Sequence, residues 1–160
     1  MRKQVISEGS RRPTPADGVW LDLESLASVE VTSEDEGHPV ESALAEGGGA
    51  GWRAARPGRQ VIRLLFDQPL SLRRIRLLFA EEGRGRTQEF ALRWSPDGGR
   101  TYREVLRQQY TFSPPGTSEE VEDYEVVLDG VTALELEITP HIGGGDARAS
   151  LRQLRTARLA

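Results

Sequence analysis

Hydrophobic and polar positions alternate along much of the chain after residue 60. A period of two is typical of antiparallel strands that have one buried face and one face toward solvent. The apolar positions are Ile75, Leu77 and Phe79 in 74–79, Phe90, Leu92 and Trp94 in 89–95, and Leu134, Leu136 and Ile138 in 134–139. This pattern predicts three half-buried strands.

Five further segments complete the expected set of strands. Residues 60–66, 102–112 and 120–128 have longer continuous apolar runs, which favours central strands. Residues 27–32 are expected to be the first strand and 149–159 the last, although the spacing of three between Leu151 and Leu154 also fits a helix. The chain is therefore predicted to be all-β, an antiparallel β-sandwich of about eight strands.

The domain organisation expected is an N-terminal extension, residues 1–26, followed by a single sandwich domain, residues 27–160. The extension has Pro13 and Pro15 ahead of a short apolar stretch, and we expect Trp20 and Leu23 to dock against the sandwich. A chain of 160 residues can bury one core without disulfides or metals.

The connections between the strands differ in length in a regular way. Tight turns are expected at 67–69, 95–99 and 129–130, where Asp129-Gly130 is a two-residue hairpin signal. The long segments are 34–59, 80–88, 113–119 and 140–149. If the strands alternate in direction, all four long segments gather at one end, which we call the long-loop end. Long loops on a rigid scaffold are a common place for function.

Composition narrows the possible functions. The net charge is −4, with 37% hydrophobic and 29% charged residues, which gives no sign of a nucleic-acid-binding protein. There is no cysteine, which excludes disulfides, a thiolate nucleophile and a cysteine-ligated zinc site. The first residues lack the apolar stretch of a secretory signal, and no apolar run approaches the ~18 residues of a membrane span. We expect a cytoplasmic protein with no nucleic-acid or membrane partner.

The order of several short motifs carries a resemblance to a known fold family. They are Ala27–Ser33, Ala43-Leu44 leading to Trp52, Pro57–Leu64, Phe90–Tyr102 with its Ser-Pro-Asp-Gly turn, Val131–Pro140 and Ala147–Leu151. Together they resemble the galactose-binding-like jelly roll of discoidin domains, also known as coagulation factor V/VIII C-type domains, and of carbohydrate-binding modules. The resemblance covers roughly residues 27 to 159.

The resemblance implies a non-catalytic domain that binds sugars, phospholipid headgroups, collagen or proteins through the loops at one end. Members often hold calcium with an Asp in the first long loop and a Glu in the last strand. This chain has Glu46 and Gln153 near those places, so we expect neither calcium nor any other cofactor. Residues 52–58 and 112–118 are also similar to the N-terminal domain of the eukaryotic single-strand-break repair scaffold, which binds a DNA polymerase. Residues 95–102 resemble an Asp-box, which we interpret as turn chemistry.

Candidate binding residues lie in or beside the long segments. Arginine guanidinium groups make paired hydrogen bonds to carboxylates, phosphates and sugar hydroxyls, and an aromatic face suits the C–H side of a sugar ring. The candidates are Arg53, Arg56, Arg84, Arg86, Tyr110, Phe112, His141, Asp146 and Arg148. The alternatives are that the arginines pair with acids on the same loops, and that Tyr110 and Phe112 belong to the core. Trp52 and Trp94 are expected in the core, and His38 and His141 are expected to be ordinary loop histidines.

Catalysis has no support in the sequence. There is no nucleophile elbow, no HExxH and no phosphate-binding glycine motif with lysine. We therefore expect a binding module and not an enzyme, with a carbohydrate or another polar molecule bound at the long-loop end. The alternative is a cytoplasmic protein–protein interaction module that uses the same loops, including Pro114-Pro115-Gly116.

Overall fold

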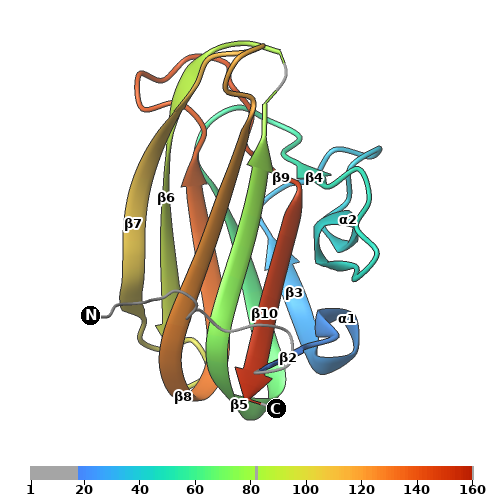
Figure 1. Cartoon of the computed structure of the whole chain (residues 1–160), viewed down its shortest axis with the longest axis vertical. Coiled ribbons are helices and arrows are strands. Elements are labelled where there is room, and N and C mark those ends of the chain that lie inside the picture. Colours follow the sequence, from blue (N-terminus) through green and yellow to red (C-terminus); the bar gives the residue numbers. More distant parts are fainter. Residues whose placement is uncertain (1–17, 82, 160) are drawn as a thin grey trace, which may run out of the picture.

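Two layers of antiparallel strands pack face to face in the computed structural model, which describes residues 18–81 and 83–159 (Figure 1). The elements are β2 (Gly18–Trp20), α1 (Leu23–Leu26), β3 (Ala27–Val31), α2 (Glu41–Leu44), β4 (Trp52–Arg53), β5 (Gln60–Ala80), β6 (Arg86–Ser95), β7 (Arg103–Phe112), β8 (Glu119–Thr139), β9 (Ser150–Leu151) and β10 (Gln153–Leu159). The predicted all-β jelly-roll sandwich is confirmed.

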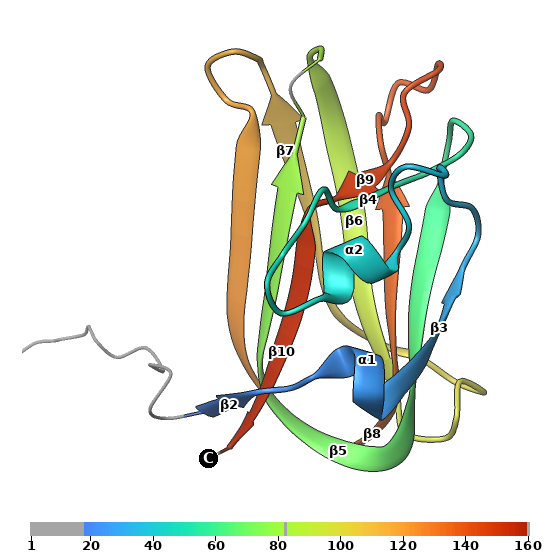
Figure 2. The same ribbon diagram turned by 90° about the vertical axis from the view of Figure 1, so that its right-hand side faces the viewer.

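Strands β5 and β8 each run through both layers. The first half of β5 pairs with the second half of β8, for example Ile62 with Leu136, and the other two halves pair with each other, for example Leu77 with Glu122. Between the halves the register shifts, and both strands fold over together at the lower end of the molecule (Figure 2). One layer thus contains β3, β6, β7 and one half of each long strand, and the other contains β2, β10 and the remaining halves.

This arrangement corrects two expectations. Asp129-Gly130 does not close a hairpin, because the segments on either side of it pair with different halves of β5 and not with each other. Gly130 nevertheless has the positive φ, 71°, that the turn signal required. Strand β7 is not central, because within the described residues it pairs with β6 alone.

The two ends of the sandwich domain also differ in detail from the expectation. Residues 149–159 form β9 and β10, so the helical alternative is wrong. Before β3, residues 18–20 add a strand to β10, and Leu23 is buried in the core as expected. Trp20 is partly buried between the guanidinium groups of Arg74 and Arg155. The rest of the expected extension, residues 1–17, lies outside the described residues, and its boundary at residue 26 stays a prediction.

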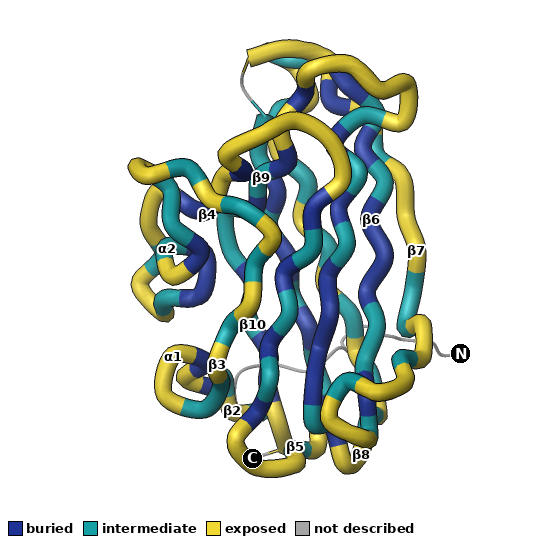
Figure 3. The backbone as a smooth tube through the Cα atoms, turned by 180° about the vertical axis from the view of Figure 1, so that it is seen from behind, coloured by how far each residue is buried: buried dark blue, intermediate teal, exposed yellow. Residues whose placement is uncertain are grey.

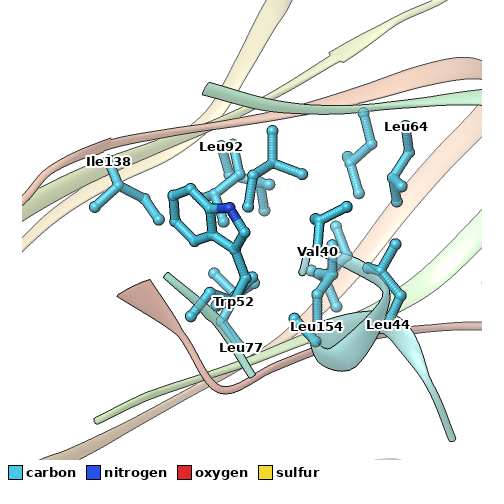
Figure 4. Close-up of a cluster of buried hydrophobic side chains, with 14 of the residues drawn as sticks. Val40, Leu44, Trp52, Leu64, Leu77, Leu92, Ile138 and Leu154 are labelled. Atoms are coloured by element: carbon cyan, nitrogen blue, oxygen red, sulfur yellow. The ribbon is translucent and has the colours of Figure 1, made fainter. Parts of the chain in front are cut away.

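The core fills the space between the layers, where the inward-facing positions of the alternating strands are buried (Figure 3). Trp52 is 1% exposed, as expected, and lies among Leu77, Leu92 and Ile138 (Figure 4). Helix α2 supplies Leu44 to the same cluster. The first long segment is therefore anchored at one side of the sandwich by buried apolar side chains.

The short turn after β6 is closed by one carboxylate. Asp97 accepts hydrogen bonds from the hydroxyl (2.7 Å) and backbone N–H (2.9 Å) of Thr101 and from the Ser95 hydroxyl (2.7 Å). These bonds stabilise the ionised carboxylate and lower the pKa of Asp97 to about 2. The segment that resembles an Asp-box is thus a structural turn.

Replacing Gly130 by alanine should destabilise the fold more than replacing Gly47. A Cβ at either position meets no atom within 4 Å, but only Gly130 has a positive φ. The left-handed conformation costs a residue with a Cβ roughly 1–2 kcal/mol, so the free energies of unfolding of the two variants should differ by about that amount in urea titrations. Equal stabilities would show that the bend in β8 tolerates a different backbone conformation.

Replacing Asp97 by asparagine should lower stability in a pH-dependent way. The pKa of Asp97 is depressed in the folded state, so its contribution is complete above its ordinary pKa of 3.8 and is lost as the pH falls toward about 2. Urea unfolding from pH 6 to pH 2 should therefore show the wild type and Asp97→Asn converging at the acid end. Parallel curves over that range would contradict this role of the carboxylate.

Candidate functional site

The four long segments meet at one end of the sandwich, as the strand order predicted (Figure 1). Backbone hydrogen bonds join them: Glu81 N–H donates to Ser118 O (2.8 Å), and Ile142 N–H donates to Thr87 O (2.8 Å). Gly58 forms a β-bridge with Arg148. Backbone hydrogen bonds therefore connect the four long segments into one surface at the long-loop end.

An open groove of about 250 Å³ lies at this end, beside the β4–β9 pair, and we call it the β4–β9 groove. Its lining comes from the first long segment, from the end of β5 and from β9. The lining residues are His38, Ala50, Trp52, Arg53, Ala80, Glu81, Gly83, Ser150, Leu151 and Arg152.

The base of the groove depends on a close backbone approach. Strand β4 pairs with β9 through Trp52–Leu151 and Arg53–Ser150. Just before β4, Gly51 has φ 85°, and a Cβ there would lie 2.7 Å from the carbonyl oxygen of Leu151, which only glycine avoids. The buried indole of Trp52 donates its N–H to Ser33 O (2.9 Å). Trp52 therefore supports the groove from below and offers no open ring face.

One side of the groove carries His38 and Arg53. The ring Nδ1 of His38 is 2.9 Å from Asp35 Oδ2, and the backbone N–H of Arg53 donates to His38 O (3.2 Å). The hydrogen bond with His38 is the main cause that lowers the pKa of Asp35. The exposed guanidinium of Arg53 has no hydrogen bond or ion pair with any residue that the structure describes.

The opposite side is organised by an ion pair between Glu81 and Arg86. Arg86 Nε donates to Glu81 Oε1 (2.6 Å), and the second carboxylate oxygen accepts the N–H of Gly83 (2.8 Å). The guanidinium also donates to Pro140 O (2.7 Å) and lies 4.9 Å from the ring centre of Phe112. Burial raises the pKa of Glu81, but the hydrogen bonds from Arg86 and Gly83 outweigh it, so the pKa lies below its ordinary value. The pair joins the loops that follow β5 and β8.

Two of the predicted site residues are corrected by their burial. Arg86 is 3% exposed and Phe112 is 0% exposed, so neither side chain is open to a ligand. Both serve the structure of the long-loop end, because the guanidinium covers the ring and ties two loops together. For Phe112 the alternative, a core residue, is correct. Tyr110 packs edge-on against Phe112 and is only partly buried.

The other predicted residues lie apart from the groove, with one exception. Arg53 is the single member of the predicted set in the lining. Arg84 pairs with Asp146 (2.6 Å), and His141 Nδ1 is 3.2 Å from Thr87 N, while Arg56 and Arg148 are exposed. Pairing of arginines with loop acids, the alternative, thus holds for Arg84 and Arg86 but not for Arg53. Whether the residues outside the groove contact a ligand stays a prediction.

Sequence reasoning missed most of the groove residues. Ser150 and Arg152 are two positions apart on β9 and the residue after it, so a firm strand assignment for 149–159 would have placed them on one face. His38 and Glu81 had no such signal, because their positions depend on how the two loops fold. Within the described ranges, no group of three or more His, Cys, Asp or Glu residues could hold a metal ion. In the same ranges no helix is long and apolar enough to cross a membrane.

Comparisons with known proteins identify the fold. No family model matches the chain, and no curated protein matches it. Solved structures do match. The family 32 carbohydrate-binding module of NanJ from Clostridium perfringens, in complex with galactose, has a TM-score of 0.66 at 12% identity, over 88% of this chain and 99% of that one. The family 32 module of AlyQ, in complex with 4,5-unsaturated mannuronic acid, has a TM-score of 0.59 at 13% identity, over 82% and 94%.

A third match is chitosan-binding module 1 from a chitosanase/glucanase of Paenibacillus sp. IK-5, with a TM-score of 0.60 at 16% identity, over 85% of this chain and 98% of that one. The fold is therefore the galactose-binding-like jelly roll that the sequence motifs indicated. At these identities the likeness concerns the fold.

Replacing Arg86 by leucine should destabilise the protein far more than replacing Arg84. Both arginines form ion pairs of 2.6 Å, but the Arg86 side chain is 1% exposed and that of Arg84 is 55% exposed. Removing one partner of a buried pair costs roughly 3–5 kcal/mol, whereas an exposed pair contributes about 1 kcal/mol or less. Urea unfolding of Arg86→Leu and Arg84→Leu measures the difference, and similar losses would show that the buried pair does not hold the loops.

Proposed function

We propose that this chain is a non-catalytic carbohydrate-binding module that takes its ligand in the β4–β9 groove. The observation that carries the proposal is an open groove with a polar lining at the long-loop end. The jelly-roll fold adds support, because the similar structures include modules in complex with sugars. Fold alone does not establish function, so the argument depends on the groove.

The lining offers the groups that sugar hydroxyls need. Arg53 and Arg152 are donors, and the His38 ring presents a second nitrogen beside the one that faces Asp35. The Ser150 hydroxyl donates to Ala80 O (3.3 Å), which leaves its oxygen lone pairs to accept. A groove of about 250 Å³ is below the usual range of about 300–1,000 Å³ for drug-sized ligands. It suits one or two sugar rings.

Binding without bond cleavage fits the carboxylates of the groove. Hydrolysis of a glycosidic bond ordinarily uses two carboxyl groups on either side of it. Among the described lining residues only Glu81 is acidic, and its two oxygens accept hydrogen bonds from Arg86 and Gly83. A carboxylate in these bonds, with a lowered pKa, is poorly suited to act as a general acid.

Filling the groove should abolish sugar binding without loss of stability. Ala50 is exposed and lines the groove, whereas Ala55 is exposed outside the lining, so Ala50→Trp and Ala55→Trp form a matched pair. After a glycan array has identified a ligand, calorimetric titration should show that binding is lost in Ala50→Trp and retained in Ala55→Trp. Both variants should keep the wild-type melting temperature.

Two outcomes would contradict the proposal. If Tyr110→Ala or Arg148→Ala removes binding and Ala50→Trp does not, the ligand binds near these two residues at the long-loop end and not in the groove. If no glycan binds and a pull-down recovers one stoichiometric protein, the protein-interaction alternative is correct.

A further inference from the structure

The β4–β9 groove contains an arginine, Arg53, that pairs with no described carboxylate, and this indicates the class of sugar. We infer that the groove selects an acidic saccharide, whose carboxylate is bound by Arg53. The inference rests on the proposed carbohydrate-binding function and specifies its ligand.

The first step is the charge of the lining. The chain as a whole is acidic, with 25 acidic and 21 basic residues. The described lining reverses this balance, because Arg53 and Arg152 are cationic and only Glu81 is anionic. Moreover, the charge of Glu81 is compensated by the buried guanidinium of Arg86, 2.6 Å away. The exposed guanidinium of Arg53 therefore brings to the groove a positive charge that no described carboxylate balances.

The second step is the state of Arg53. Several arginines of this chain pair with carboxylates, including Arg63 with Glu135 (2.8 Å) and Arg74 with Asp123 (2.6 Å). Arg53 has no such partner among the described residues, although its backbone is held on both sides by β4 pairing and by His38. The carboxylate of Asp35, a nearby acid, already pairs with the ring of His38 at 2.9 Å. An arginine in a fixed position with an unused planar fork matches a carboxylate in paired hydrogen bonds.

The third step is the direction of the donors. The register of the β4–β9 pair places Arg53 opposite Ser150, and Arg152 follows two positions later along the chain. All three residues line the same groove. A sugar ring in the groove would thus meet Arg53 at one point and hydroxyl-binding groups beside it. This geometry discriminates by charge as well as by shape.

The test compares ligands that have the same sugar ring and differ in charge. Oligogalacturonate and its full methyl ester have the same sugar rings, but only the first is anionic. We expect titration calorimetry to give at least about tenfold tighter binding of the free acid, as charge-assisted hydrogen bonds contribute more than neutral ones. The preference should decrease as salt is raised. Oligomannuronate, chitosan oligomers and a sulfated galactan complete the panel.

Arg53→Gln should remove the preference for the free acid, whereas Arg100→Gln, which makes the same charge change at an exposed residue outside the lining, should keep it. Arg53→Lys retains the charge without the planar fork and should give an intermediate preference. The readout is the ratio of the two dissociation constants, which a general loss of folding would not change.

Four results would overturn the inference. Equal binding of the acid and the methyl ester, or tighter binding of chitosan, would leave the proposed function intact and reject acidic selectivity. Binding of sulfated galactan without uronate binding would reject the carboxylate as the recognised group. If no saccharide of the panel or of a glycan array binds, both the inference and the proposed function fail.

Discussion

The continuous pairing of β5 with β8 is the constraint on which the rest of the structure depends. These two strands fold over together, so the same ladder contributes to both layers of the sandwich. Both strands bend at the same end of the sandwich. The loops that lead into and out of these two strands must therefore lie at the opposite end. The four long segments are therefore gathered by the backbone pairing itself, before any side chain of the long-loop end makes a contact.

Two local features then convert that gathering into a defined surface. Gly51 lets β4 approach β9 closely, which brings Arg53 beside Ser150. The buried pair of Glu81 and Arg86 fixes the segment after β5 against Pro140. Gly51 acts through its lack of a side chain, whereas Glu81 and Arg86 act as a buried ion pair. Between them lies the β4–β9 groove, where the carboxylate of Glu81 is paired with the buried guanidinium of Arg86.

The sequence was sufficient for the fold because its information is local. Alternation in 74–79 and 89–95 requires only that neighbouring side chains point to opposite faces. The hairpin expected at Asp129-Gly130 was wrong because turn chemistry specifies a bend but not the strand that each side will pair with. The site was harder still. Arg86 and Phe112 were predicted to contact the ligand because they lie in or beside the long segments. In the structure both side chains are buried, so their role is structural. His38 and Glu81 reach the groove only through the folding of two separate segments.

The shared ladder also bears on how the chain reaches this structure. Arg63 in β5 pairs with Glu135 in β8, residues that are 72 positions apart, and each layer contains one half of both strands. Neither layer is thus a contiguous piece of chain. Topologies dominated by such distant contacts have high contact order and fold in milliseconds to seconds, not in microseconds. Both layers should consequently appear and disappear in one cooperative event, so a fragment that ends before β8 would retain no native half of the sandwich.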